Sequence, residues 1–346
     1  MIRFGKSSKG LSDVKSDFFN KNDALLELAI SQAQIYAEQP KRKACKTCNS
    51  KLIGETFEKF GVKYVICSEC THLNGLHEDT DAFCKAIYVS EDTAEFATSY
   101  SEVNYESIER RLSLIYRPKR DFLFDALEEL NENVFDLGFA ELGSGSGYFL
   151  KALQESGIKQ FLGHEVSKKQ VEFANELIGG PRITLHNLKE NVQIISDLKA
   201  DVLVMLGVLE HVQNPREILN AIRHNKNIKY LFLVVPTFSP SVFFEASFEH
   251  IMPRVLVGGH THLYTDNSLK WLAKEYSLSR EAEWWFGTDI FDLFRSISIT
   301  LSKSNEKHRL SELWTTLFKG TIDELQLCLD KQKLSSQAHI LFKVSH

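Results

Sequence analysis

The stretch Phe139-Ala-Glu-Leu-Gly-Ser-Gly-Ser-Gly-Tyr-Phe149 decides the fold class of this chain. A strand is predicted within residues 134–142, and a helix is predicted from the end of the stretch to about residue 156. The loop between them contains three glycines that allow the backbone to turn sharply and to approach a ligand closely, namely Gly143, Gly145 and Gly147. In an open parallel sheet a ligand binds at the carboxyl end of such a strand, so this loop marks the expected binding site.

The residues that follow alternate between apolar strands and helices. Near-continuous apolar strands separated by helices indicate a parallel sheet that is covered on both faces. Trp284-Trp285-Phe286 is expected to belong to a further core strand, as is the segment 338–344. The other predicted strands are 161–166, 183–186, 201–206 and 230–235, and the predicted helices between them are 168–178 and 215–224.

The residues around the glycine loop favour an adenosine-containing cofactor over a plain tight turn. Glu165 is expected to end the second strand, 22 residues after Gly143, where an acid can accept hydrogen bonds from both ribose hydroxyls. Glu141 stands directly before the glycines. The spacing G-x-G-x-G differs from the G-x-G-x-x-G of dinucleotide-binding loops, and the loop has no lysine of the kind found in a P-loop.

These residues resemble the class I S-adenosylmethionine-dependent methyltransferases over roughly residues 120–290. The resemblance implies a Rossmann-like, seven-stranded α/β sheet with helices on both faces, and S-adenosyl-L-methionine as cofactor. It places Glu141 near the methionine ammonium group and Glu165 on the ribose. Matching motifs extend the implied cofactor contacts to the loop after the first strand and to the ends of the third and fourth strands, namely Gly143, Ser144, Gly145, Gly147, Asn187, Leu188 and Gly207.

Four of the six cysteines form two C-x-x-C pairs that are 18 residues apart. Each pair can fold as a knuckle that directs two thiolates at one point, and two knuckles supply the four sulfur ligands of a structural zinc site. A redox role would need only one such pair. Four protein ligands leave no open position for substrate, so the zinc is predicted to be structural. The predicted ligands are Cys45, Cys48, Cys67 and Cys70, whereas Cys84 and Cys328 are expected to be small buried side chains.

The four-cysteine module narrows the resemblance to a subgroup that acts on small molecules and includes C-methyltransferases of deoxysugars. A sugar or sugar nucleotide is therefore one acceptor that the resemblance implies. The segment Gly258-Gly-His-Thr-His-Leu-Tyr-Thr265 lies where this subgroup has a His-rich substrate loop that typically reads His-Glu-His. Thr261 stands here in place of the acid, so neither the sugar nor methylation at carbon is carried over. Chains of this kind often close with a helix pair, which fits residues 289–304 and 308–330.

Histidines are expected on the acceptor side of the site. In methyl transfer the protein mainly positions the acceptor, and a general base is needed when the acceptor must lose a proton. The connection 236–265 is the predicted acceptor wall, because connections of more than about 15 residues usually have a function. The alternatives for these side chains are local hydrogen bonds, turn capping, packing and solvent exposure. The candidate catalytic residues are His211 and His262, and the candidate substrate-binding residues are Glu210, His260 and Tyr264.

Length and composition are those of a globular protein with about two domains. The chain has 346 residues, of which 43% are hydrophobic and 25% charged. No apolar run long enough to span a bilayer and no secretory signal are evident, so a cytoplasmic protein without a membrane partner is expected. The predicted organisation is an N-terminal helical segment at 1–40, a zinc-binding module at 41–90, a methyltransferase core at 91–288, and a helix pair with the last core strand at 289–346.

The charge distribution leaves more than one function open. A formal net charge of −5 disfavours nucleic acid as a partner of the whole chain. Residues 1–73, however, contain 12 Lys or Arg against 8 Asp or Glu, with a basic cluster at Lys41-Arg42-Lys43. The leading hypothesis is a small-molecule methyltransferase. The alternatives are an RNA methyltransferase that binds nucleic acid through the basic zinc module, and a non-catalytic cofactor-binding scaffold.

Overall fold

The computed structural model describes residues 1–10, 17–88, 105–256, 259–303 and 308–346. Its centre is an eight-stranded sheet in the order β1-β11-β12-β9-β8-β5-β6-β7. Strand β12 runs antiparallel to both of its neighbours, and all other pairs in this sheet are parallel. The strands are β1 (Ile2–Phe4), β5 (Phe139–Leu142), β6 (Phe161–Glu165), β7 (Ile183–Leu185), β8 (Val202–Leu206), β9 (Tyr230–Pro236), β11 (Leu278–Phe286) and β12 (Gln337–Val344). This is the Rossmann-like α/β architecture that the sequence predicts.

The order of the strands predicts a binding crevice beside β5. The chain adds β6 and β7 on one side of β5, and β8 and β9 on the other side. Such a change of direction leaves a crevice at the carboxyl ends of the central strands, where ligands bind in open α/β sheets. The glycine loop follows β5 and residues 207–212 follow β8, so both segments border this crevice.

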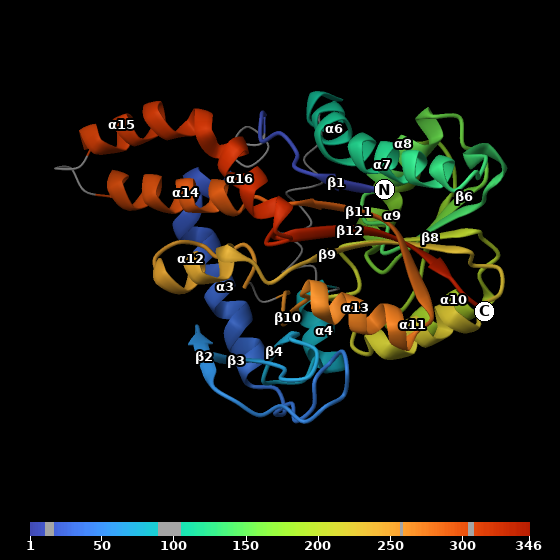
Figure 1. Cartoon of the computed structure of the whole chain (residues 1–346), viewed down its shortest axis with the longest axis horizontal. Coiled ribbons are helices and arrows are strands. Elements are labelled where there is room, and N and C mark those ends of the chain that lie inside the picture. Colours follow the sequence, from blue (N-terminus) through green and yellow to red (C-terminus); the bar gives the residue numbers. More distant parts are fainter. Residues whose placement is uncertain (11–16, 89–104, 257–258, 304–307) are drawn as a thin grey trace.

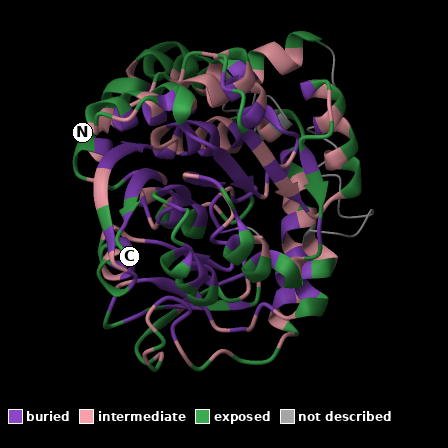
Figure 2. Ribbon diagram, turned by 90° about the vertical axis from the view of Figure 1, so that its right-hand side faces the viewer, coloured by how far each residue is buried: buried purple, intermediate pink, exposed green. Residues whose placement is uncertain are grey.

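Helices cover both faces of the sheet (Figure 1). Strand β9 is buried at all seven positions, as expected for a strand with a helical layer on each side. Figure 2 shows the same layering, with buried residues concentrated in the strands and exposed ones on the outer helices. One face is covered by α7 (Arg117–Glu129), α8 (Tyr148–Glu155) and α9 (Lys168–Ile178), and the other by α10 (Asn191–Asp197), α11 (Pro215–His224) and α13 (Asp266–Glu275).

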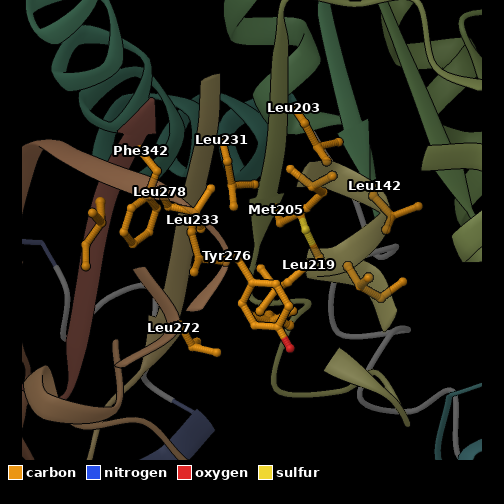
Figure 3. Packing of buried hydrophobic residues seen from close by; sticks show 14 of the residues in the cluster. Leu142, Leu203, Met205, Leu219, Leu231, Leu233, Leu272, Tyr276, Leu278 and Phe342 are labelled. Carbon is orange, nitrogen blue, oxygen red and sulfur yellow. The ribbon is translucent and has the colours of Figure 1, made fainter. Parts of the chain in front are cut away.

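Mainly aliphatic side chains from several strands and from α10, α11 and α13 make up the core of the second face, part of which is shown in Figure 3. Leu203 and Met205 from β8 lie next to Leu231 and Leu233 from β9, and Leu219 of α11 packs over them. Each of these side chains is at most 1% exposed. Full burial of one such side chain contributes roughly 1.5–3 kcal/mol, so this layer fixes the position of the loops at the carboxyl edge.

The N-terminal segment does not have the entirely helical structure that was expected. Strand β1 pairs in parallel with β11 and forms the edge of the sheet, which therefore has eight strands instead of seven. The backbone of Gly5 and the Trp285 carbonyl continue this pairing with a hydrogen bond of 3.0 Å. The helical part consists of α2 (Asp17–Asn20) and α3 (Asn22–Ala37), and residues 11–16 of the predicted helix lie outside the described residues.

A second sheet forms around the cysteines, in the antiparallel order β10-β4-β3-β2. Its consecutive strands are β2 (Thr56–Lys59), β3 (Val62–Ile66) and β4 (Leu73–Gly75). Its fourth strand, β10 (His262–Leu263), belongs to the long connection after β9. Helices α3 and α4 (Asp81–Tyr88) pack against this sheet. The predicted acceptor wall and the cysteine module therefore share one sheet.

The remaining helices flank the two sheets. Helix α6 (Tyr105–Arg111) continues through a π-helical turn, Leu112–Tyr116, into α7. This turn lies just before Pro118, which has no N–H to donate to the preceding turn. The predicted helix 308–330 is interrupted by a 3₁₀ turn at Lys319–Thr321. The others are α12 (Pro240–Ser247), α14 (Asp289–Ser302), α15 (His308–Phe318) and α16 (Ile322–Lys331). Within the described residues, no helix combines the length and apolarity needed to cross a membrane.

Candidate functional site

The glycine loop reaches the carboxyl edge of the sheet through left-handed backbone conformations. Gly143, Gly145 and Gly147 have φ angles of 68°, 51° and 73°, which L side chains rarely adopt. A Cβ at Gly143 would also lie 2.6 Å from Cγ2 of Val208, in the segment after β8. Glycine is therefore required at this position both for the turn and for close contact between the two loops of the crevice.

Glu165 fixes the glycine loop as well as facing the crevice. Its Oε2 atom accepts a hydrogen bond of 2.8 Å from the amide of Gly145. Its Oε1 atom accepts from the amides of Val166 and Ser167 at 2.8 and 2.9 Å. A carboxylate offers about four acceptor positions, so about one remains for a ligand hydroxyl. Glu165, which is predicted to contact the ribose, thus also holds the glycine loop in place, a second role that the sequence pattern did not indicate.

Two buried glutamates and one buried lysine lie behind the glycine loop. Glu141 and Glu210 are each 2% exposed and Lys119 is 9% exposed. Burial raises the pKa of Glu141 well above its ordinary range and that of Glu210 to about 8, and it lowers the pKa of Lys119 to about 8. The lysine charge opposes the shifts of both carboxyls. Glu141 Oε2 and Glu210 Oε2 find no hydrogen-bond partner among the described residues, so the crevice contains buried acceptor atoms with unused capacity.

Lys119 was not predicted from the sequence, although a signal was available. It lies on the same helical stripe of α7 as Phe122 and Ala126, whose side chains are at most 1% exposed. A lysine on an apolar stripe is seldom buried without an acidic partner. Its position in the helix could therefore have identified a buried cation whose charge acts on buried carboxyls such as Glu141.

The other predicted cofactor residues also lie at the carboxyl edge. Asn187 is exposed and begins the 3₁₀ turn Leu188–Glu190 after β7. Gly207 follows β8 with a φ angle of 71°, and its amide donates to the carbonyl of Val234 at 2.9 Å. The Ser144 amide donates to the carbonyl of His164 at 3.1 Å. The structure thus brings these residues to the edge where the sequence placed them.

The four predicted metal ligands converge on one point. Their sulfur atoms all lie within 4.8 Å of one another, with Cys45 Sγ 3.6 Å from Cys70 Sγ and Cys48 Sγ 3.5 Å from Cys67 Sγ. A tetrahedral zinc ion with Zn–S bonds of about 2.3 Å requires S–S separations of about 3.8 Å. The donor set and its spacing therefore fit one zinc ion.

The two cysteine knuckles have the same backbone structure. Asn49 and Thr71, each directly after the second cysteine of a pair, have φ angles of 63° and 61°. The Asn49 amide donates to the Cys45 carbonyl, and the Thr71 amide donates to the Cys67 carbonyl, both at 2.9 Å. Hydrogen bonding with the Cys70 thiol, opposed by burial and aided by backbone amides, lowers the pKa of Cys45 to about 5. Identical turns from two separate hairpins are what a symmetric four-sulfur site requires.

The two remaining cysteines differ from each other. Cys84 is 1% exposed, as predicted, and burial raises its pKa to about 12. Cys328 is exposed, so the prediction that it is buried was wrong. Its position on the outer face of α16, beside the exposed Leu325, explains the difference.

The cysteine module contacts the acceptor wall directly. His262 and Leu263 in β10 pair with Asn74 and Leu73 in β4. The hydroxyls of Thr71 and Thr265 are 2.7 Å apart, and the Gly75 amide donates to the Thr261 carbonyl at 2.8 Å. The position of residues 261–265 therefore depends on the folded module.

His262, a predicted catalytic residue, lies inside this contact. Its Nδ1 atom is 2.7 Å from Nε2 of His72, and both rings are at most 1% exposed. Burial lowers the pKa of both histidines well below their ordinary value, so both are neutral. Tyr264, predicted to bind substrate, is fully buried against the two rings, and its hydroxyl donates to the Leu209 carbonyl at 3.5 Å. In this conformation His262 and Tyr264 lie behind the surface of the wall.

His211 and His260 lie together with Glu210 at the edge of the crevice. The two imidazole rings are stacked, with centroids 5.2 Å apart, and His211 Nε2 is 3.9 Å from Glu210 Oε1. Nδ1 of His211 donates to the Gly259 carbonyl at 2.9 Å, and Nδ1 of His260 donates to the Val255 carbonyl at 3.1 Å. Burial lowers their pKa values to about 3 and about 4, so both rings are neutral. The His211 side chain is 27% exposed and can be reached by a ligand.

A buried ion-pair network beside these histidines was not predicted. Asp79 bonds with Lys46, and it accepts from Arg42 at 3.0 Å, with all three side chains at most 8% exposed. Thr261, at the position where the resemblance expects an acid, donates its hydroxyl to the same carboxylate. Gln213, after β8, donates to the backbone carbonyl of Asp79 at 2.8 Å. No local pattern reveals this network, because its members come from segments that only the complete fold brings together.

The rest of the acceptor wall is held by buried carboxylates. Glu245 accepts hydrogen bonds of 2.7–2.8 Å from the amides of Arg254, Val255 and Leu256, and so fixes the loop that positions His260. Arg254 in turn forms a salt bridge of 2.8 Å with Asp292 in α14. Sequence patterns gave no sign of these contacts.

A further buried carboxylate, that of Asp289 in α14, connects the start of the acceptor wall to the C-terminal helices. Asp289 accepts from the hydroxyls of Ser239 and Ser241, and from the Gln326 amide at 3.2 Å. All four side chains are at most 4% exposed. The predicted helix pair is thus a support for the acceptor wall.

Comparison with protein families identifies the segment that carries the site. Residues 110–281 match the model of a family described as a methyltransferase domain. The matched segment contains the glycine loop, Glu165, Glu210, His211 and His260. The comparison with curated proteins finds no match.

Solved structures similar in shape include several methyltransferases. Magnesium protoporphyrin IX methyltransferase from Synechocystis PCC 6803, with bound SAH, is 12% identical, with a TM-score of 0.48 over 77% of this chain and 100% of that chain. The plantazolicin methyltransferase in complex with SAH is 14% identical, with a TM-score of 0.46 over 76% and 94% of the two chains. Geranyl diphosphate C-methyltransferase from Streptomyces coelicolor is 11% identical, with a TM-score of 0.39 over 70% and 87%.

The family match and the sheet agree on the same segment. Residues 110–281 contain β5 to β9 and the first four residues of β11, in the strand order expected for a cofactor crevice beside the glycine loop. This segment of the chain therefore matches a methyltransferase domain in sequence and has the Rossmann-like α/β fold.

Proposed function

We propose that this chain transfers the methyl group of S-adenosyl-L-methionine to a small-molecule acceptor. The observation that carries the proposal is the crevice at the carboxyl ends of β5 and β8, with the glycine loop on one side and neutral histidines on the other. S-adenosylmethionine supplies a methyl group that its sulfonium already activates, so the protein has to bind, orient and exclude water.

We call the glycine-loop side of the crevice, with Glu141 and Glu165, its cofactor half. The residues of this half suit the chemical groups of S-adenosylmethionine. Glu141 Oε2 is a buried acceptor without a described partner, and it suits the ammonium group of the methionine moiety. Glu165 has acceptor capacity left for a ribose hydroxyl. Asn187 and Leu188 would border the adenine, and Gly207 would let the backbone after β8 approach the cofactor.

We call the opposite side of the crevice, with Glu210, His211 and His260, its acceptor half. Its imidazoles and its carboxyl group would orient the methyl acceptor. His211 is partly exposed, is neutral, and has its basic lone pair on Nε2, so it could take a proton from an acceptor hydroxyl. Glu210 and His260 would hold polar groups of the acceptor beside it. His262 would act through the position of the wall, because its ring is bonded to His72 and buried.

The cysteine module would hold one structural zinc ion and so support the acceptor wall. All four ligand positions are occupied by cysteine sulfur, which leaves none for substrate. The pairing of β4 with β10 connects this module to residues 262–263. A structural zinc site is also a source of folding energy, so the metal would stabilise the wall without touching the acceptor.

Nucleic acid as the acceptor is not favoured by any contact in the described residues. Arg42, in the centre of the basic cluster, is 8% exposed and bonded to Glu78 and Asp79. Lys46 is buried against the same Asp79. Arg42 and Lys46 are thus neutralised within the protein, and only Lys41 and Lys43 of the basic cluster remain as exposed cations of the kind that bind phosphates.

The proposal can be tested by assaying transfer of labelled methyl from S-adenosylmethionine to hydroxylated small molecules, sugar nucleotides and RNA. His211→Ala should lower the rate about 10²–10⁴-fold if the imidazole acts as base, with SAH affinity nearly unchanged. His224→Ala, an exposed histidine of α11, is the matched control and should leave the rate unchanged. Transfer to RNA alone would overturn the small-molecule proposal, and SAH binding without any transfer would indicate a scaffold.

A further inference from the structure

Three side chains of the acceptor half form a set that the proposed base mechanism does not explain. One nitrogen or oxygen atom from each of Glu210, His211 and His260 lies within 4.8 Å of the others. Two imidazoles and one carboxylate are a common ligand set for first-row transition metals, and they leave open positions for a further ligand. This set is chemically distinct from the four thiols of the cysteine module.

The hydrogen bonds of the two histidines are those of metal ligands. In each ring Nδ1 donates to a backbone carbonyl, that of Gly259 for His211 and that of Val255 for His260. A carbonyl oxygen can only accept, so the proton is fixed on Nδ1 and the basic lone pair on Nε2. Metal-ligating histidines usually donate their other ring N–H to a carbonyl or carboxylate in this way.

The carboxylate provides an independent indication of a missing ligand. Glu210 is 2% exposed, and its Oε2 atom has no hydrogen-bond partner among the described residues. A buried carboxylate oxygen without a partner is unfavourable, and a bound cation would satisfy it. Glu245 adds to the preorganisation, because it holds the amide of Val255, whose carbonyl orients His260.

We infer that Glu210, His211 and His260 bind one divalent first-row transition-metal ion, and that this ion holds an oxygen atom of the methyl acceptor. Metal–ligand bonds of about 2.0–2.2 Å require ligand atoms about 3.0–3.5 Å apart. The present separations, which reach up to 4.8 Å, need to shorten by as much as about 1–2 Å, which requires small rotations of these side chains. The binding of the ion stands on the structure alone, whereas its contact with the acceptor rests on the proposed function. A bound ion would lower the pKa of a coordinated acceptor hydroxyl, so His211 would not have to act as the base.

Titration with Co²⁺ tests the inference on the full-length protein with zinc in the cysteine module. We expect one equivalent of Co²⁺ to bind, with weak visible absorption and without the sulfur-to-metal charge-transfer band that thiolate ligands produce. Glu210→Gln and His260→Ala should each weaken this binding at least about 10-fold. His224→Ala, an exposed histidine outside the set, should leave it unchanged.

Two further measurements separate this inference from the proposed function. SAH binding by each variant shows whether the domain is folded, and it should be retained. A chelator that removes Co²⁺ but not the zinc should abolish methyl transfer without weakening SAH binding. Binding of Co²⁺ that is equally tight in Glu210→Gln, in His260→Ala and in the unchanged protein would overturn the metal site. Failure to bind SAH would overturn the proposed function and leave the Co²⁺ result standing.

Discussion

The cofactor half and the acceptor half of the sheet edge differ in how far apart their parts lie in the sequence. Glu141, the glycine loop and Glu165 fall within 25 residues, and the loop and Glu165 bond to each other directly. The acceptor half draws on residues 42–79, 207–213, 236–265 and 289–336. The first is a local motif on a rigid sheet, and the second is a surface that exists only when distant segments meet. A substitution in one half should therefore impair that half and leave the other half largely intact.

Removal of a zinc ligand should have the largest effect, and mainly on the acceptor half. Cys67→Ser should lower the free energy of unfolding by several kcal/mol, because the energy of structural zinc binding is also folding energy. Metal analysis should fall from about one zinc ion per chain toward none. Thermal unfolding followed by circular dichroism measures the loss of stability.

The exposed Cys328 provides the matched control for this experiment. Cys328→Ser should change neither the metal content nor the unfolding temperature, because the thiol lies outside the cluster. Full metal content in Cys67→Ser, or an equal loss in both variants, would contradict the assignment of the ligands.

A side chain in the glycine loop should disrupt the cofactor half. Gly143→Ala forces Ala into a backbone with φ of 68° and places Cβ 2.6 Å from Val208. The backbone strain costs roughly 1–2 kcal/mol and the overpacking roughly 1–3 kcal/mol, so the native loop conformation should be destabilised by about 2–5 kcal/mol. Calorimetry should show weaker SAH binding, while zinc content stays at one equivalent.

Gly180→Ala is the control, since no atom lies within 4 Å of a Cβ at that glycine. This variant should bind SAH normally. If Gly143→Ala also bound SAH normally, the loop would not be the cofactor site.

Glu165→Ala should have a smaller effect on the same half. The change removes a charge-assisted acceptor for the ribose and three hydrogen bonds from backbone amides, including that of Gly145. SAH binding should weaken by roughly 1–3 kcal/mol. Glu176→Ala, an exposed position in α9, should have no effect on SAH affinity. Equal affinity in the two variants would remove Glu165 from the cofactor site.

The contribution of the C-terminal helices to the free energy of unfolding should depend weakly on pH, because the Asp330 carboxyl in α16 titrates. Burial raises the pKa of this carboxyl from 3.8 to about 6 in the folded protein. The folded state thus holds a proton that the unfolded state has already released, so this stabilisation is complete below about pH 4 and is lost as the pH rises through 6. Between pH 4 and 7 the unchanged protein should lose roughly 2 kcal/mol relative to Asp330→Asn, as measured by denaturant unfolding.

Glu324→Gln, at an exposed position of the same helix, provides the comparison. Its stability profile should run parallel to that of the unchanged protein. A flat difference between Asp330→Asn and the unchanged protein would show that Asp330 titrates normally.

The sequence predicted the parts of the molecule that are local in the chain. The helices 168–178 and 215–224 were predicted to the residue, and the order of alternating elements followed from apolar periodicity. The four cysteines could be identified because each knuckle fixes its own geometry within four residues. Strand β1 was missed because three residues carry too little pattern, and their pairing depends on β11, which is distant in the sequence.

The acceptor half was predicted less completely for a physical reason. His211 and His260 could be proposed from their place after strands, but the choice between them and His262 depends on burial, which the sequence does not reveal. The Lys46–Asp79 pair and the bonds of Glu245 join residues 33 positions and 9–11 positions apart across irregular backbone. Such contacts follow from the complete packing and not from any repeating pattern.

Calorimetric titration of the purified protein with SAH, and separately with NADH, tests the central claim most directly. The crevice beside β5 has the G-x-G-x-G loop, a buried Glu141 and Glu165. We predict that one SAH molecule binds per chain and that NADH gives no saturable heat. Saturable NADH binding together with no response to SAH would contradict the account.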